Sequence, residues 1–543
     1  MSISKNDIIK LKITAISSDG LGIGRADNLV IFVKDSAVGD ELYVKVMKVK
    51  KNLAYAKIES IISPSDDRIE VDCPVSGKCG GCVYRHISYE SELKIKRQKV
   101  IDAVTRIGKI DASLVRDIIG SDKVDAYRNK AMIPIGLDSE GNVVMGFYAN
   151  HSHRIVNCID CRLSNEIFSK IAQDVFEFIK KRPNMADEKS NKRIRHLYLR
   201  YAQSNESVMV CFVTSGKDFD DSDILINSLV EKYPQIKSVV INSKYDDNNV
   251  ILGQKCRTVY GDDYIIDTLC GLEFEISPLS FYQVNHGSAE KIYSIAREYA
   301  ALGEEDTLLD LYCGTGTIGL SMAKDCKELI GVEIVEDAVK NAKKNAEKNG
   351  IKNARFLCMD AAVAAKSLAQ KGISPDVIII DPPRKGIDKS LISTIVEMSP
   401  KRVVYVSCDP ATMARDIALF ESENYFVKEI TPVDMFPRTA HVETVVLLSR
   451  KMPDDKIEVD LELDELDLTA VESKATYQEI KDYVLKEYGF KVSTLYISQV
   501  KRKCGIIERE NYNNSCKENP HIPQCPKDKE AAIRAALERF AMI

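Results

Sequence analysis

One cysteine, Cys408, lies between the strongly apolar run VVYVS and a predicted helix that begins at Pro410. A thiolate is a strong nucleophile and the start of a helix lowers its pKa, so this position favours covalent chemistry. The alternative is a buried core cysteine, which is the commoner state of a free thiol. Glu443, in TAHVETVVLL, could be the general base of such a reaction, or a strand-end carboxylate paired with Arg438 or His441.

A glycine-rich turn, DLYCGTGTIGL, joins a predicted strand to a predicted helix. Gly314 and Gly316 let the backbone approach a ligand closely. Glu333 ends the next strand, where a carboxylate can accept hydrogen bonds from both hydroxyls of a ribose. Asp360 follows the third strand and could lie beside an adenine. The pattern favours an adenosine-type ligand, with a dinucleotide-binding domain as the alternative.

Two further strands end in chemically distinctive residues, DPPRKG and SCDP. Ligands bind at the carboxyl ends of parallel strands, so Asp381 and Cys408 should face the same ligand. The DPPRKG motif resembles that of enzymes that methylate the amino groups of bases. Those enzymes carry an aromatic residue after Pro-Pro, whereas this chain has Arg384 there, which argues against methylation of an amino group. A thiolate can add to C6 of a pyrimidine and make C5 nucleophilic enough to take a methyl group from a sulfonium.

The elements that must position these residues alternate between strand and helix from Asp306 onward. The predicted strands are TLLDLY, ELIGVEI, ARFLCM, DVIIID and RVVYVS, with helical stretches such as EDAVKNAKKNAEKN between them. This alternation predicts a doubly wound α/β domain. We expect an antiparallel last strand in it, which would bring Glu443, at its beginning, to the edge where Cys408 lies.

Short alternating apolar runs separated by glycines occupy the region from Lys5 to Ile62. They predict a small closed antiparallel barrel of about five strands. The run KVMKVKK adds positive charge, so this barrel either binds an oligonucleotide or has a solvated edge guarded by lysines. The region that follows, to residue 276, has the pattern of a mixed α/β domain.

The C-terminal part begins with an acidic stretch, PDDKIEVDLELDELDL, beyond Lys451. Two helical runs then resemble a helix-turn-helix. The second run carries Lys501, Arg502 and Lys503, which could contact nucleic acid. A small helical docking module is the alternative reading of so general a pattern.

The length and composition of the chain limit the classes of protein to which it can belong. A chain of 543 residues exceeds one hydrophobic core, so several domains are expected. The absence of an apolar run near the roughly 18 residues of a membrane helix predicts a globular, soluble protein without a membrane partner. Fifteen scattered cysteines without a signal peptide favour the cytoplasm. The net charge of -5 means that any nucleic-acid binding must come from local patches.

The motifs FYQVN, DLYCGTG, DPPRKG, SCDP and HVET, in this order, resemble the RNA uracil-5 methyltransferase family, particularly its 23S ribosomal RNA members. The resemblance covers about residues 5 to 450, and YRNKA (127–131) also matches the family. It implies a cofactor, S-adenosylmethionine. The positions that it assigns to that cofactor are Gln283, Tyr312, Glu333 and Asp381.

The same resemblance implies that Cys408 is the nucleophile and Glu443 the base, and that the N-terminal barrel is similar to the TRAM RNA-binding domain. The implied substrate is a uridine flipped out of a loop of ribosomal RNA. Transfer RNA is the alternative substrate. A non-catalytic RNA-binding or assembly factor with a methyltransferase fold is the alternative of a different class.

Five cysteines form two groups, Cys73, Cys79 and Cys82 in CPVSGKCGGC, and Cys158 and Cys161 in VNCIDCRL. Their spacing allows either an iron-sulfur cluster or a tetrahedral zinc site on the two C-x-x-C pairs. Cluster-bearing members of the family resemble this chain at CxxxxxCGGC and at the later cysteine. The resemblance therefore implies a [4Fe-4S] cluster on Cys73, Cys79, Cys82 and Cys161, with a structural or RNA-docking role.

Together these observations predict a monomer with an OB-like (TRAM) β-barrel in residues 1–62 and a central α/β domain with the iron-sulfur site in residues 63–276. A Rossmann-like methyltransferase domain is expected in residues 277–450. An acidic linker and helical extension of unknown role are expected in residues 451–543.

Overall fold

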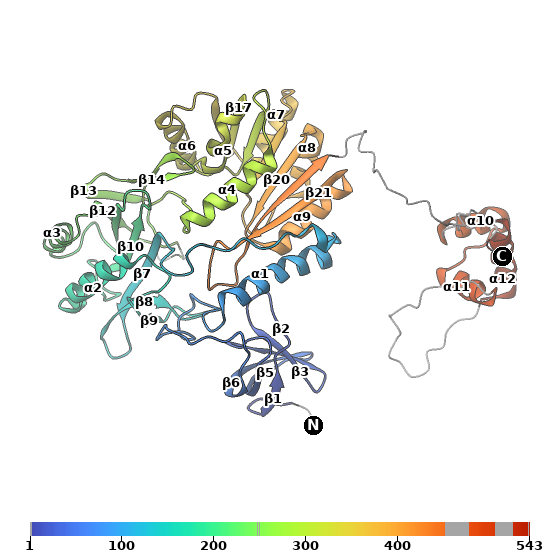
Figure 1. Ribbon diagram of the computed structural model, residues 1–543, viewed down its shortest axis with the longest axis horizontal. Coiled ribbons are helices and arrows are strands. Elements are labelled where there is room, and N and C mark those ends of the chain that lie inside the picture. Colours follow the sequence, from blue (N-terminus) through green and yellow to red (C-terminus); the bar gives the residue numbers. More distant parts are fainter. Residues whose placement is uncertain are drawn as a thin grey trace. The chain divides into compact units, whose positions relative to one another are not determined.

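The computed structural model describes residues 3–246, 248, 250–450, 477–504, 525–540 and 542. The chain divides into two compact units, Met1–Asp455 and Lys456–Ile543 (Figure 1). None of the helices in the described ranges is long and apolar enough to cross a membrane.

The N-terminal sheet has six strands within the described residues, in the order β1-β5-β6-β4-β3-β2. Leu42, Val44 and Val46 of the fifth strand alternate with exposed or half-buried residues and form part of the barrel's core. The strands are β1 (Ile8–Lys12), β2 (Ala15–Ile16), β3 (Gly22–Ala26), β4 (Leu29–Val33), β5 (Glu41–Val49) and β6 (Leu53–Ser63). The prediction of a purely antiparallel barrel is wrong for one pair, because β6 inserts between β5 and β4 and runs parallel to β4.

A second sheet, of seven strands, has the order β13-β12-β11-β10-β7-β8-β9 in the described chain. Helix α2 packs Phe168, Ile171 and Val175 into the core under this sheet. The elements are β7 (Lys130–Leu137), β8 (Val143–Tyr148), β9 (Ile155–Asn157), α2 (Glu166–Lys180), β10 (Ile194–Tyr201), β11 (Val208–Thr214), α3 (Ser222–Lys232), β12 (Ile236–Ser243) and β13 (Lys255–Gly261).

The third large sheet, also of seven strands among the described residues, has the order β18-β17-β16-β19-β20-β22-β21. The strands β18, β17, β16, β19 and β20 are parallel, and β22 and β21 are antiparallel additions. Their bounds are β16 (Thr307–Leu311), β17 (Glu328–Glu333), β18 (Ala354–Cys358), β19 (Val377–Ile380), β20 (Arg402–Ser407), β21 (Tyr425–Val433) and β22 (Glu443–Arg450).

Helices cover both faces of this third sheet (Figure 1). One face packs on α4 (His286–Ala300), α5 (Thr317–Met322) and α6 (Glu336–Lys348), together with the hairpin of β14 (Ile265–Leu269) and β15 (Leu272–Ile276). The other face packs on α1 (Tyr89–Ala103), α7 (Ala361–Gln370), α8 (Lys389–Met398) and α9 (Pro410–Ser422). The predicted doubly wound α/β domain is confirmed.

Four short helical turns complete this unit in the described ranges. They are η1 (Val104–Gly108), η2 (Ala112–Leu114), η3 (Pro183–Met185) and η4 (Ala323–Asp325).

The C-terminal unit contains α10 (Tyr477–Tyr488), α11 (Thr494–Lys503) and α12 (Lys527–Arg539), which bury a core of their own. Lys501 is buried with its Nζ 4.2 Å from the centroid of the Tyr477 ring, and Lys503 forms an ion pair of 2.6 Å with Glu530. Two of the three cations that suggested a nucleic-acid contact are therefore engaged within the unit. The predicted acidic stretch, residues 453–468, lies outside the described residues.

Candidate active site

The residues predicted for catalysis and for the cofactor all line one cavity of about 1490 Å³. The cavity lies at the carboxyl edge of the parallel strands, because each of these strands ends at one of these residues or within two residues of it. They are Gln283, Tyr312, Gly314, Glu333, Asp360, Asp381, Cys408 and Glu443.

The turn between β16 and α5 is built around a strained tyrosine. Tyr312 has a φ of 64°, a left-handed conformation that is rare for a bulky residue, and Gly314 follows with a φ of 55°. The N–H of Gly314 donates to Oε2 of Glu333 over 3.1 Å, and the N–H of Val335 donates to Oε1 over 2.9 Å. The Glu333 carboxylate is therefore held in a fixed orientation at the end of β17.

The two other acidic residues of the cofactor region differ in their surroundings. Asp360 is the N-cap of α7, and its Oδ1 accepts hydrogen bonds from the N–H groups of Ala362 and Val363. The carboxyl of Asp381 has no hydrogen-bond or ion-pair partner among the described residues, and burial raises its pKa to about 7. Asp381 is therefore an unpaired carboxyl in the cavity wall.

Gln283 belongs to the FYQVN segment, which the YRNKA motif holds in place. The side-chain Nδ2 of Asn129 donates to the carbonyl oxygen of Gln283 over 2.9 Å, and its backbone N–H donates to that of Val284 over 2.9 Å. No role for YRNKA could be assigned from the sequence, because this contact joins residues far apart in the chain.

These donors and acceptors fit S-adenosylmethionine. Glu333, at the end of the second strand, suits the ribose hydroxyls, and Asp360, after the third, suits the adenine side. The unpaired Asp381 carboxyl suits a positively charged group of the ligand.

The proposed nucleophile and base come from neighbouring antiparallel strands. Ser407 of β20 pairs with Thr444 of β22, so the next cross-strand positions in this register are Cys408 and Glu443. Asp409 caps α9 by accepting hydrogen bonds from two N–H groups at the helix start, at 3.0 and 2.9 Å. The prediction that an antiparallel strand brings Glu443 to Cys408 is confirmed.

Electrostatics at this pair differ from the prediction for the thiol. Burial, with the carboxyls of Glu443 and Asp381, raises the pKa of Cys408 to about 11, although Arg384 lowers it. Burial and Asp381 likewise raise the pKa of Glu443 to about 8. The predicted lowering of the thiol pKa by the helix start is wrong, because desolvation dominates and the Asp409 carboxylate already caps the helix.

The alternative reading of Glu443, a surface ion pair, does not hold. Arg438 lies 3.6 Å from Glu92 instead, and Glu443 has no ion-pair partner among the described residues. Arg384, Phe436 and His441 line the same cavity. The sequence does not assign Phe436 and His441 to the site, because only the folded hairpin between β21 and β22 brings them to this edge.

The five cysteines of the two groups line a second cavity, of about 270 Å³. All are free thiols, and the buried Arg85 and the half-buried Arg128 and Lys130 line the same space. Within the described residues no set of three His, Cys, Asp or Glu side chains has a metal-binding arrangement. The structure nevertheless brings the predicted ligands together at one cavity. These are Cys73, Cys79, Cys82 and Cys161, and Cys158 lines the same cavity.

Comparison with known sequences gives two family matches. Residues 235–451 match the family model described as tRNA (Uracil-5-)-methyltransferase, and residues 5–58 match the TRAM domain. An uncharacterized RNA methyltransferase of Halalkalibacterium halodurans is 40% identical over 451 residues, which are 83% of this chain and 98% of the relative. Another, of Clostridium tetani, is 41% identical over 449 residues, 82% of this chain and 97% of the relative.

Among solved structures, the chain is similar to the Pyrococcus abyssi tRNA (uracil-54, C5)-methyltransferase in complex with S-adenosyl-L-homocysteine. The TM-score is 0.63 at 26% identity, and the match covers 81% of this chain and 100% of the other. The large α/β domain thus has the fold of an S-adenosylmethionine-dependent methyltransferase. The chain belongs to the RNA uracil-5 methyltransferase family and carries an N-terminal TRAM domain.

Proposed function

We propose that the protein methylates C5 of a specific uridine in 23S ribosomal RNA through a covalent adduct with Cys408. The observation that carries the proposal is a single cavity that holds Cys408 and Glu443 together with the cofactor-type residues Glu333 and Asp381. The uridine must leave its base stack to reach a thiol at this depth, so the substrate is a flipped base in a loop.

In this mechanism S-adenosylmethionine supplies a methyl group bound to a positively charged sulfur. The Cys408 thiolate adds to C6 of the uracil, so that a C–S bond forms and the C5=C6 double bond breaks. The electron pair on C5 then forms a bond to the methyl carbon, while the bond of that carbon to sulfur would break and leave its electrons on a neutral thioether. Glu443 next removes the proton from C5, the double bond re-forms, and the C–S bond breaks to release the thiolate.

Arg384 supports the thiolate in this scheme. It is the positive side chain of the cavity that lowers the pKa of both Cys408 and Glu443. Because burial raises the pKa of Cys408, the thiol must lose its proton when the base enters, and the positive charge of Arg384 favours that loss.

Substitution of the two reacting groups tests the mechanism. Cys408→Ala should lose both methylation and the covalent complex with RNA that contains 5-fluorouridine. Glu443→Gln should still add to the base but release product slowly, so that the methylated protein–RNA adduct accumulates. A Cys408→Ala variant that methylates RNA at the wild-type rate would refute the covalent mechanism, and a wild type that methylates no RNA would favour the non-catalytic alternative.

Transfer RNA is the second candidate substrate, because the Pyrococcus abyssi structure carries tRNA in its name and matches 81% of this chain. The barrel and the cysteine groups favour ribosomal RNA. Mapping 5-methyluridine in 23S ribosomal RNA and in tRNA from a deletion strain, complemented with the wild type or with Cys408→Ala, distinguishes the two. Loss of the modification from tRNA alone would overturn the ribosomal assignment.

We further propose a [4Fe-4S] cluster on Cys73, Cys79, Cys82 and Cys161. The three cationic side chains that line the cavity with these thiols support a centre of several negatively charged thiolates. Zinc on the two C-x-x-C pairs is the alternative, and it would need Cys158 in place of Cys73.

Single substitutions separate the two metals. Protein purified without oxygen should contain iron and absorb near about 400 nm, where such clusters absorb. Cys73→Ser should lose the iron, while Cys158→Ser should keep it. Zinc that is lost from Cys158→Ser and retained in Cys73→Ser would refute the cluster.

The proposed division of labour assigns RNA binding to residues 1–62, the cysteine-bound centre to 63–276 and the chemistry to 277–450. Residues 451–543 have no proposed part in the reaction. An enzyme with this RNA substrate works in the cytoplasm.

A further inference from the structure

The connection between β21 and β22, residues 434–442, carries two rings into the catalytic cavity. We call these residues the strap. Phe436 and His441 both line the cavity, and the residue after the strap is Glu443. Hairpin connections are usually two to five residues, so a longer one needs support from the rest of the protein to stay ordered.

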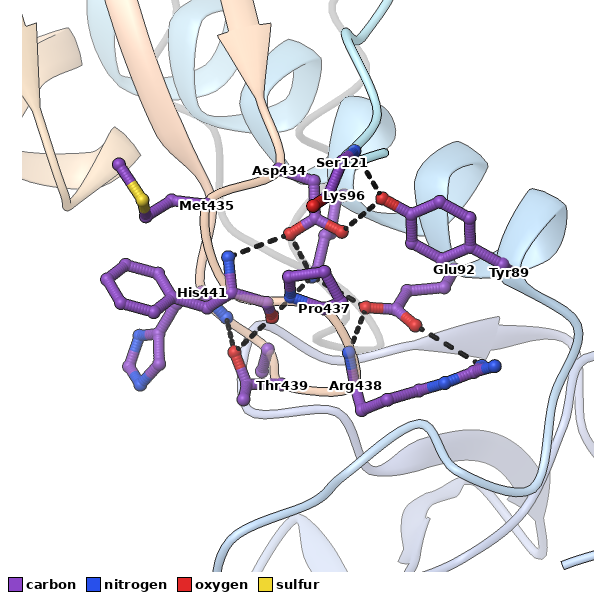
Figure 2. Close-up of polar contacts among 12 residues, drawn as sticks. Tyr89, Glu92, Lys96, Ser121, Asp434, Met435, Pro437, Arg438, Thr439 and His441 are labelled. Atoms are coloured by element: carbon purple, nitrogen blue, oxygen red, sulfur yellow. Dashed lines mark hydrogen bonds and ion pairs between the residues drawn. The ribbon is translucent and has the colours of Figure 1, made fainter. Parts of the chain in front are cut away.

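Helix α1 supplies much of that support through a buried lysine (Figure 2). The side chain of Lys96 is 1% exposed, and its Nζ donates to Oδ1 of Asp434 over 2.7 Å and to the carbonyl oxygen of Phe436 over 3.0 Å. It also pairs with Glu92 over 2.7 Å. A buried charge is stable only with such partners, so Lys96 fixes the beginning of the strap.

The middle and end of the strap are held in the same way. Oε1 of Glu92 accepts a hydrogen bond from the N–H of Arg438 over 2.7 Å, and Nζ of Lys99 donates to the carbonyl oxygen of Ala440 over 2.8 Å. Further donors reach strap carbonyls from other segments. The side-chain amide of Asn285 donates to the carbonyl oxygen of Met435, and the hydroxyl of Tyr127 donates to that of Pro437. The backbone N–H groups of Val83 and Tyr84 both donate to the carbonyl oxygen of Arg438.

Against this rigid backbone the His441 side chain is free. Figure 2 shows its ring pointing away from the ion pairs, and it is exposed to the cavity. The ring makes an edge contact with Phe436 at a centroid distance of 6.0 Å and an angle of 74°. Among the described residues, neither ring nitrogen has a hydrogen-bond partner.

The chemical state of His441 suits a neutral ligand. Partial desolvation inside the cavity and the positive charges of Arg384 and Lys99 lower its pKa to about 4, so the imidazole is uncharged near neutral pH. A neutral imidazole has one N–H donor and one acceptor nitrogen. Uracil has carbonyl oxygens and an N–H group that can pair with either.

We propose that the strap, anchored by Lys96, presents the His441 imidazole as a hydrogen-bonding contact for the pyrimidine base that enters the cavity. The inference rests on the proposed function, because the base is that of the uridine methylated there. His441 binds the substrate, and Lys96 is a positioning residue that acts through the strap.

Two substitutions of His441 separate hydrogen bonding from ring packing. Asn retains a donor and an acceptor, whereas Phe retains only a ring. His441→Phe should raise the KM for RNA about tenfold, the value of one lost hydrogen bond, and His441→Asn should recover most of the loss. The affinity for S-adenosylmethionine, measured by calorimetry, should be unchanged in both.

Lys96→Met tests the anchor, and Lys94→Met is its matched control on the same helix, because Lys94 forms only an exposed pair with Glu90. Lys96→Met should speed hydrogen exchange of the strap amides and raise the KM for RNA. In the double variant with His441→Phe, the KM should rise no further than in Lys96→Met alone, since both changes remove one contact. Lys94→Met should behave as the wild type.

The outcomes separate this inference from the proposed function. If the wild type methylates uridine and His441→Phe has the same KM for RNA, the role of His441 is overturned and the proposed function stands. Additive effects in the double variant would overturn the link between Lys96 and His441. A wild type that methylates no uridine in any RNA would overturn the proposed function and, with it, this role of His441.

Discussion

Cys408 and Glu443 lie in surroundings that favour their uncharged forms. Their pKa values, about 11 and about 8, follow chiefly from burial and from carboxyls close to each group. A thiol of this kind is not a ready nucleophile, so the proposed mechanism requires that the entry of the base and the cofactor activate it. Such a thiol is also protected from adventitious oxidation, which requires the thiolate.

Alkylation of Cys408 tests this state directly. In the protein alone, iodoacetamide should label Cys408 slowly at neutral pH, because about one thiol in ten thousand is ionised there, and the rate should rise with pH. Peptide mass spectrometry can follow it beside Cys358, an exposed cysteine of the same domain. Equal labelling of the two at neutral pH would contradict the raised pKa.

The buried carboxyl of Asp310, in the strand before the glycine-rich turn, should make the free energy of unfolding of the protein depend on pH. Its Oδ2 accepts a hydrogen bond from the N–H of Gly319, its Oδ1 is buried without a partner among the described residues, and burial raises its pKa from 3.8 to about 8. The folded state therefore binds this proton more tightly than the unfolded state. The stabilisation is complete below about pH 4 and is lost as the pH rises towards about 8.

Asp310→Asn removes this proton while keeping an acceptor for Gly319. The free energy of unfolding of the variant should fall less steeply than that of the wild type between about pH 5 and pH 8, by up to about 1.4 kcal/mol per pH unit. Urea unfolding at several pH values measures the difference. Parallel curves for the two proteins would show that Asp310 does not titrate in this range.

At the scale of elements, Asp409 both caps the start of α9 and directly follows the proposed nucleophile, Cys408. Asp409→Ala leaves two N–H groups at the helix start without their acceptor and should cost about 1 kcal/mol, whereas Asp409→Asn keeps the cap. Thermal unfolding measures both. Because Cys408 is the neighbouring residue, the rate of 5-fluorouridine adduct formation should fall in the alanine variant only; equal rates would separate the cap from the thiol.

The strand pattern of the catalytic domain was predictable because it is local. The five parallel strands are apolar runs that end in chemically distinctive residues, and a parallel sheet brings such ends to one edge. Glu443 followed from the same rule once β22 was taken as antiparallel. Family motifs then added Gln283 and Tyr312, which no periodicity reveals.

Other features depend on contacts that the sequence does not encode locally. Lys96 and Glu92 lie on α1, whose mixture of charges resembles an exposed helix, yet both are buried because the strap supplies their partners. The raised pKa of Cys408 depends on burial in the folded domain and on the carboxyls of Glu443 and Asp381, which come from other parts of the sheet. The parallel pair of β4 and β6 depends on where the chain returns in the barrel.

At the scale of the whole molecule, the C-terminal unit is an addition to a complete enzyme. It has its own core, and the Halalkalibacterium halodurans relative is covered over 98% of its length by a match to 83% of this chain. A chain that ends after Asp455 should therefore keep its thermal unfolding midpoint and its affinity for S-adenosylmethionine. Scanning calorimetry and titration calorimetry measure the two; a lower midpoint would show that the C-terminal unit stabilises the rest.

The cross-strand register of β20 and β22 has a consequence for how this protein can change in evolution. Since backbone hydrogen bonds set Cys408 opposite Glu443, insertions or deletions in α9 or in the turn after it leave the reacting pair unchanged. A single residue gained or lost within β20 would instead turn the thiol to the other face of the sheet. Homologues should vary in length in α9 or in the turn after it, but not inside β20 or β22.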